Sequence, residues 1–72
     1  MQYTYTCMEQ NFYNKEIGNY TTYGIKLEGT SVAVGDVSCE RGIVEQLVSD
    51  LNECQAEPIH LYDIIDDRLA LN

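Results

Sequence analysis

The chain has 72 residues and a formal net charge of −8, which comes from 12 acidic side chains against 4 lysines and arginines. A chain of this length makes one domain, residues 1–72, and buries only about 60% of the surface that its unfolded form exposes. The charge argues against direct binding to nucleic acid or to anionic membranes, because both depend on cationic side chains. It suits a protein that meets a basic protein partner.

The three cysteines, Cys7, Cys39 and Cys54, are an odd number at wide and irregular spacing. This pattern fits neither a disulfide framework nor a zinc site, and reduced thiols in the cytoplasm are the simplest interpretation. The N-terminal residues do not resemble a secretion signal, and no apolar stretch reaches the ~18 residues that a membrane helix needs. We therefore expect a cytoplasmic protein without a bound cofactor.

The N-terminal half is typical of β-structure. Residues Gln2–Glu9 alternate aromatic and small polar side chains with a period of two, which predicts a first strand. Polar residues over 11–19 indicate a hairpin turn, and Phe12, Tyr13 and Ile17 are able to extend the strands toward its tip. A second strand is expected over Tyr20–Glu28 and a short third strand over Ser31–Val37. The predicted sheet has an open face that carries Thr4, Thr6, Met8, Thr22, Gly24 and Lys26.

The C-terminal half changes to a helical period. Ser38 is suited to cap the start of a first helix with its hydroxyl, and Pro58 is suited to the first position of a second helix that runs to about Ala70. Each predicted helix has one apolar stripe, because its apolar residues recur at the i, i+3, i+4 spacing. The stripes are Ile43, Val44, Leu47, Val48, Leu51 and Cys54 in the first helix and Leu61, Tyr62, Ile65 and Leu69 in the second, which Ile59, Ile64 and Leu71 widen.

These elements predict an α+β fold in the order βββαα. We expect a three-stranded antiparallel β-meander followed by two helices packed on one face of the sheet, because three strands need a covered face to be stable. The edges of the outer strands are able to pair with another chain, so a homodimer through the sheet is one expected form of association.

The candidate contact surface consists of His60, Asp63 and Asp67, which follow one another at i, i+3 and i+7 on one side of the predicted second helix. An imidazole and two carboxylates at this spacing are able to bind a metal or to form an acid–base pair. Solvent-facing acids and a histidine near a helix end also have an ordinary structural explanation. We interpret the three as a contact surface and assign no catalytic, cofactor-binding or metal-binding residue.

Cysteine and tyrosine are two other residue types in the chain that are able to take part in chemistry. A thiolate nucleophile needs a base or a helix N-terminus to lower its pKa, and only Cys39, next to the predicted Ser38 cap, has such a position. The tyrosines of the predicted strands are able to stack on nucleobases, but sheets that bind RNA are basic. Packing in the core and at interfaces is the better interpretation of Tyr3, Tyr5, Tyr20 and Tyr23.

Several segments resemble a family of small uncharacterised proteins from Firmicute bacteria. They are Tyr20–Ile25, Asp36–Ser38, Val44–Val48 with Leu51–Glu53, and above all Pro58–Asp67, which begins with the motif Pro-Ile-His-Leu. The resemblance covers about Tyr3 to Leu69. It implies a bacterial domain of unknown function and supplies no reaction, ligand or partner.

The sequence therefore favours a small acidic protein-binding or regulatory module in a bacterial cytoplasm, and not an enzyme. One alternative is a metal-binding or hydrolytic site around His60, Asp63 and Asp67. A further alternative is an acidic mimic that competes with nucleic acid for a nucleic-acid-binding partner.

Overall fold

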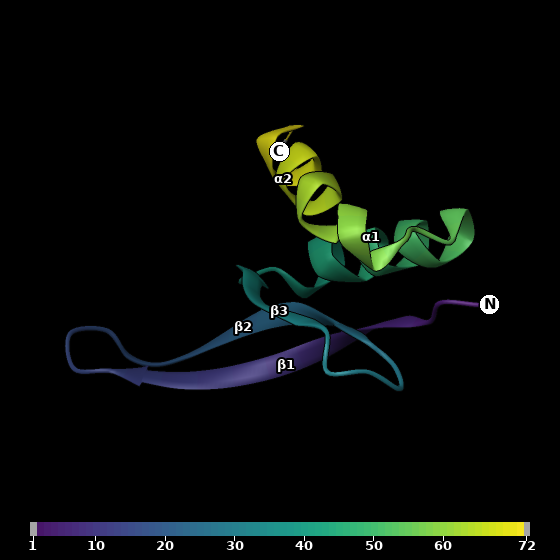
Figure 1. The fold of residues 1–72 in the computed structure, drawn as a ribbon. Coiled ribbons are helices and arrows are strands. Elements are labelled where there is room, and N and C mark those ends of the chain that lie inside the picture. Colours follow the sequence, from purple (N-terminus) through teal and green to yellow (C-terminus); the bar gives the residue numbers. More distant parts are fainter. Residues whose placement is uncertain (1, 72) are drawn as a thin grey trace.

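The computed structural model describes residues 2–71, and the side chains of residues 2–70. Three antiparallel strands in the order β1-β2-β3 are followed by two helices on the same side of the sheet, which confirms the expected α+β fold (Figure 1). No helix among the described residues is long and apolar enough to cross a membrane. The elements are β1 (Tyr5–Asn14), β2 (Gly18–Leu27), β3 (Ala33–Ser38), α1 (Arg41–Cys54), the 3-10 turn η1 (Pro58–His60) and α2 (Leu61–Leu71).

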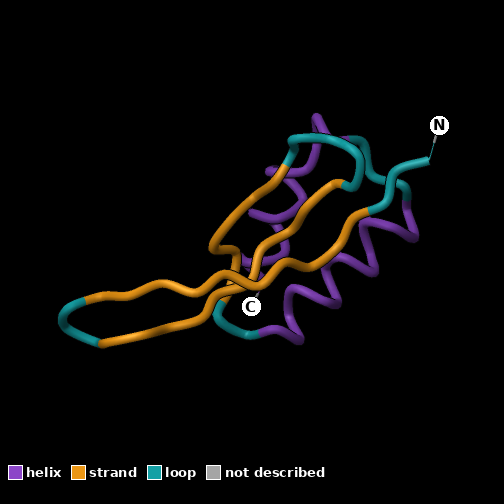
Figure 2. The backbone as a smooth tube through the Cα atoms, turned by 90° about the horizontal axis from the view of Figure 1, so that it is seen from below, coloured by secondary structure: helices purple, strands orange, loops and turns teal. Residues whose placement is uncertain are grey.

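Strands β1 and β2 form a hairpin that is longer than the sequence predicts. They pair from Tyr5 opposite Leu27 to Asn14 opposite Gly18. Gly18, the first residue after the turn, has a φ of 82°, which glycine adopts without strain. Polar residues after Glu9 were expected to form a loop, but they continue β1 to Asn14. The outer part of this hairpin, residues 10–22, projects beyond the helices and is called the arm below (Figure 2).

The third strand is irregular and covers part of the sheet face that we expected to be open. Val34 pairs with Ile25 and Ser38 with Tyr23, so Gly35, Asp36 and Val37 bulge opposite Gly24. A Cβ on Gly24 would lie 2.4 Å from the carbonyl oxygen of Val34 and 2.8 Å from Cε of Met8. The Asp36 amide, at a φ of 51°, donates to Oε1 of Gln10 across the sheet at 2.9 Å.

The expectation of an open face is therefore wrong for Thr22 and Gly24, which are both buried. Thr22 is 1% exposed, and its hydroxyl has no hydrogen-bond partner. The other residues of this face that we named are half-buried or exposed. Alternation of side chains could not show the bulge, because it depends on how β3 crosses the neighbouring strand.

Helix α1 lies along the sheet and supplies most of the helical part of the core. Its residues Val44, Leu47 and Leu51 are buried against Tyr5, Ile25 and Leu27. Each such side chain contributes about 1.5–3 kcal/mol to folding by leaving water. Cys54, which the apolar stripe placed in the core, is exposed.

The start of α1 differs from the predicted start. Ser38 does not cap the helix: it belongs to β3, and its Oγ accepts from the amide of Glu40 at 3.1 Å. Glu40 is the N-cap residue of α1 and makes no side-chain cap hydrogen bond. Cys39 lies exposed between β3 and α1, directly before the N-cap residue Glu40 and not in the first turn of the helix.

The second helix also begins differently. Pro58 starts a single 3-10 turn, and the α-helix proper begins at Leu61. Leu61 and Ile65 enter the core, but Tyr62 and Leu69, which the stripe placed there, are 62% and 37% exposed. Helix α2 leans away from the sheet, whereas α1 lies along it (Figure 1). The sheet therefore covers less of the surface of α2 than a helix lying along it would have covered.

Candidate functional site

The predicted contact residues lie on the exposed side of η1 and α2. His60 closes the 3-10 turn, where its amide donates to the carbonyl oxygen of Glu57 at 2.9 Å. Asp63 is in the first turn of α2, a position where a negative charge suits the helix dipole. His60, Asp63 and Asp67 are all exposed. Among the described residues no group of three or more His, Cys, Asp or Glu side chains is placed to hold a metal ion.

Two large apolar side chains lie among these polar residues. Ile59 is 78% exposed and Tyr62 is 62% exposed. The apolar periodicity of the sequence assigned both to the buried side of the helix, and so missed them as surface residues. Leu61 and Ile65, an i, i+4 pair, form the buried side of the helix. Ile59 and Tyr62 lie outside the core. This C-terminal surface comprises Ile59, His60, Tyr62, Asp63, Asp66 and Asp67.

Negative charge is concentrated in the helical half of the molecule. The arm carries only Lys15 and Glu16 as charged residues, so it is formally neutral. The two arginines of the helical half, Arg41 and Arg68, leave a clear excess of acids there. The acids from residue 40 onward are Glu40, Glu45, Asp50, Glu53, Glu57, Asp63, Asp66 and Asp67.

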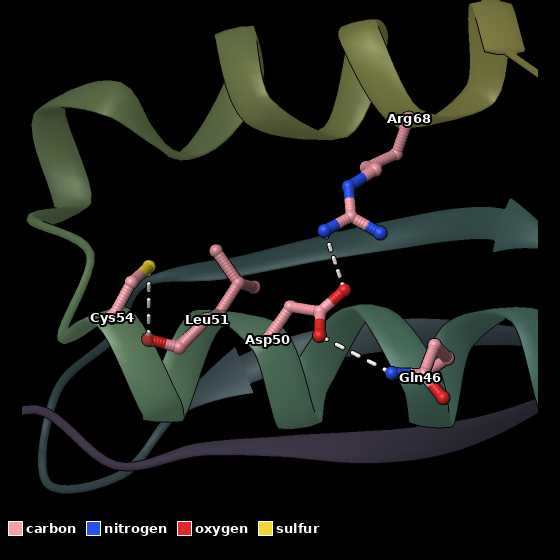
Figure 3. A network of polar contacts seen from close by, with 5 residues as sticks. All are labelled: Gln46, Asp50, Leu51, Cys54 and Arg68. Carbon is pink, nitrogen blue, oxygen red and sulfur yellow. Dashed lines mark hydrogen bonds and ion pairs between the residues drawn. The ribbon is translucent and has the colours of Figure 1, made fainter.

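A polar contact holds α2 to α1 (Figure 3). Arg68 forms an ion pair with Asp50, and Nε2 of Gln46 donates to the same carboxylate at 3.2 Å. A partly exposed ion pair contributes up to about 1 kcal/mol, so it orients α2 more than it stabilises the fold. A groove of about 520 Å³ lies next to this contact. It is lined by Asp50, Leu51, Glu53, Cys54, Ile64 and Arg68.

The three cysteines differ in exposure, since Cys7 is half-buried and Cys39 and Cys54 are exposed. Cys7 is half-buried, and its burial together with the charge of Glu45 raises the pKa of its thiol. A raised pKa leaves less thiolate near neutral pH. Cys54 is exposed, and its thiol donates weakly to the carbonyl oxygen of Leu51 at 3.7 Å.

Tyr5 lies in the core, whereas Tyr13 and Tyr20 lie in the arm. Tyr5 is buried, and its hydroxyl donates to the carbonyl oxygen of Ala56 at 2.6 Å. In the arm, the ring of Tyr20 stacks on Phe12 with 5.5 Å between ring centroids. Tyr13 is 72% exposed and Ile17 is 71% exposed. The sequence predicted a turn over residues 11–19 with these side chains able to extend the strands, but it did not identify them as a surface.

The opposite end of β1 has a closed edge. The side-chain amide of Asn52 accepts from the amide of Tyr5 at 2.7 Å and donates to its carbonyl oxygen at 2.9 Å. Gln55 makes the same double contact with Tyr3, at 2.9 and 3.0 Å. Two side chains thus satisfy backbone groups that a neighbouring strand would otherwise pair with, and they protect this edge from another chain.

Comparison with known proteins gives a family and no activity. No curated protein and no solved structure matches the chain. A family model described as a family of unknown function, DUF6514, matches residues 1–71. The chain belongs to this family of unknown function.

Proposed function

We propose that the protein is a small non-catalytic protein-binding or regulatory module of the bacterial cytoplasm, and that the C-terminal surface makes the contact. The observation that carries the proposal is the exposure of Ile59 and Tyr62 among the acids Asp63, Asp66 and Asp67. The Firmicute origin implied by the Pro-Ile-His-Leu motif belongs to the same proposal.

The chemistry of this surface suits a protein partner. Tyrosine is enriched at protein interfaces, because it adds a large apolar area and one polar group at a small entropic cost. Each Å² of apolar surface removed from water contributes about 25 cal/mol. Ile59 and Tyr62 therefore offer an apolar centre, and the surrounding carboxylates form a charged rim.

The charge defines the kind of partner. A surface with an apolar pocket and a rim of lysine and arginine would complement Ile59, Tyr62 and the three aspartates. Complementary rim charges increase the association rate and make it sensitive to salt. If the basic partner surface normally holds nucleic acid, the protein would act as an acidic competitor.

Matched double variants test this proposal. The arm carries the same two residue types at similar exposure, since Tyr13 is 72% and Ile17 is 71% exposed. The test variant replaces Ile59→Ser and Tyr62→Ser, and the control replaces Ile17→Ser and Tyr13→Ser. Each is immobilised beside the wild type, and the proteins retained from extracts of the source cells are compared at physiological salt.

We expect a protein that is retained by the wild type and the control but not by the Ile59→Ser, Tyr62→Ser variant. Asp63→Asn with Asp67→Asn should weaken its retention, and so should higher salt. Retention by all variants alike, or retention of no specific protein, would contradict the proposal. Circular dichroism of each variant confirms that its fold is intact.

A further inference from the structure

The arm leaves part of β2 without a neighbouring strand. Strand β3 pairs only with the segment of β2 from Tyr23 to Lys26. Beyond that segment, β2 continues to Gly18 with β1 on one side only. The edge of β1 is closed by Asn52 and Gln55 only at Tyr3 and Tyr5. In the arm β1 also has a neighbouring strand on one side only, so the tests below compare the two edges directly.

The hydrogen-bond pattern identifies which β2 residues face the free edge. The amide of Glu28 donates to Thr4, on the side of β1, and the amide of Leu27 donates to Val32, on the other side. Backbone groups alternate between the two sides of an antiparallel strand. Odd-numbered residues of β2 therefore direct their N–H and C=O away from β1, and Asn19 and Thr21 do so beyond the end of β3. Among residues 2–71 no group hydrogen-bonds to Asn19 or Thr21 on that side.

The arm also exposes apolar surface that a two-stranded ribbon does not bury. Phe12 and Tyr20 stack on one face, Tyr13 lies on the other, and Ile17 lies in the turn. A ribbon of two strands is marginally stable in water, and a third strand or another covering layer stabilises it. The free edge and the exposed rings occur together on residues 12–21.

We propose that the arms of two copies of this chain join through the free edge of β2, antiparallel and about a two-fold axis. The register that uses both free residues places Asn19 of one copy opposite Thr21 of the other, and Tyr20 opposite Tyr20. The Phe12–Tyr20 stack of each copy then continues into that of the other as one aromatic row. Because the same strand pairs in both copies, the free N–H and C=O groups of each are hydrogen-bonded at once, as in a closed two-fold dimer.

Charge favours a second copy over a basic partner at this place. The arm holds only Lys15 and Glu16 as charged residues, whereas most acids lie in the helical half. Two arms are therefore able to meet without the like-charge repulsion that two helical surfaces would have. The dimer contact is separate from the C-terminal surface and does not depend on the function proposed for it.

Proline variants of one cross-strand pair test the edge. Asn11 and Thr21 face each other, and Oγ1 of Thr21 donates to Oδ1 of Asn11 at 2.8 Å. Thr21→Pro removes an N–H at the free edge of β2, and Asn11→Pro removes the equivalent outward N–H of β1. Both variants lose the same side-chain hydrogen bond and leave the ladder between β1 and β2 unchanged, so they differ in the edge they block.

Sedimentation velocity over a range of concentrations gives the result. We expect a dimer in the wild type and in Asn11→Pro, and a dissociation constant at least about tenfold higher in Thr21→Pro. A wild type that stays monomeric throughout, or equal dissociation of both proline variants, would overturn the proposal.

Cysteine cross-linking tests the register in case a proline variant fails to fold. In a background with Cys7→Ala, Cys39→Ser and Cys54→Ser, Tyr20→Cys places the thiols of two copies at facing positions of the joined sheet. Facing Cα atoms of an antiparallel pair come within disulfide distance, about 4.4–6.8 Å. We expect mild oxidation to give a covalent dimer with Tyr20→Cys and not with Phe12→Cys, which lies one strand further from the axis. Equal yields, or no dimer from Tyr20→Cys, would contradict this register.

Discussion

The two ends of the β1–β2 hairpin differ in almost every property that stabilises a sheet. At the end near Tyr5, α1 covers one face, buried side chains fill the core, and Asn52 and Gln55 close the edge of β1. In the arm no helix covers the strands, and the outer edge of β2 is free. The difference separates two roles within one pair of strands: the covered end carries the stability of the fold, and the arm is available for contacts.

The largest test of this division compares core and arm truncations. Leu51→Ala should lower the free energy of unfolding by about 3–5 kcal/mol, because Leu51 is fully buried and a cavity would remain. Ile17→Ala, on an exposed side chain of the arm, should change it by less than about 0.5 kcal/mol in the monomer. Urea denaturation at low protein concentration measures both. Similar losses for the two variants would show that the arm belongs to the cooperative core.

A smaller effect is expected where the edge of β1 is closed. Asn52→Ala leaves the N–H and C=O of Tyr5 without their partner, so we expect a loss of about 1–3 kcal/mol. Asn11→Ala removes an exposed side-chain hydrogen bond of the arm and should cost less than about 0.5 kcal/mol. The same denaturation measurement applies. An unchanged free energy of unfolding in Asn52→Ala would show that water replaces the side chain at this edge. The hydrogen bonds of Asn52 to Tyr5 would then not contribute to stability.

The smallest effect is a dependence of stability on alkaline pH that arises at the covered end. Burial raises the pKa of the Tyr5 phenol above its usual value of 10.0, with smaller contributions from Tyr3 and Cys54. In the unfolded chain the phenol ionises at lower pH, so stability is constant below that value and falls as the pH rises through 10. Burial also raises the pKa of the Cys7 thiol above 9.0, so part of the decline begins there.

Unfolding of the wild type and of Tyr5→Phe, measured from pH 8 to about pH 11, tests this assignment. We expect a shallower decline of stability in Tyr5→Phe, with the part due to Cys7 remaining. A wild-type slope in Tyr5→Phe would contradict the assignment of this dependence to Tyr5.

Local periodicity predicted the order of the elements and most of the core. The alternation around Tyr5 and Ile25 and the helical spacing of Val44, Leu47 and Leu51 were sufficient for the strands and for α1. The errors occurred where structure depends on contacts between distant segments. The bulge of β3 closes over Gly24, and the lean of α2 exposes Tyr62. Neither depends on the periodicity of its own segment.

The candidate site was predictable only in part. His60, Asp63 and Asp67 are exposed on one segment, as a contact surface requires, but Ile59 and Tyr62 were assigned to the interior. The arm was missed because Asn11, Asn14 and Asn19 have the composition of a loop. Stacking of Phe12 on Tyr20 and pairing of the strands make it a ribbon, and both are contacts across the hairpin.

Hydrogen exchange at individual backbone amides tests the division most directly. Measured at high and at low protein concentration, exchange at Asn19 and Thr21 should be slow when arms are paired and fast when the protein is dilute. The amide of Tyr5 donates to Oδ1 of Asn52 at 2.7 Å and should be protected equally at both concentrations. The outward amide of Asn11 should exchange fast at both. Exchange at Asn19 and Thr21 that does not depend on concentration, or that changes together with Asn11, would contradict the pairing of arms through β2.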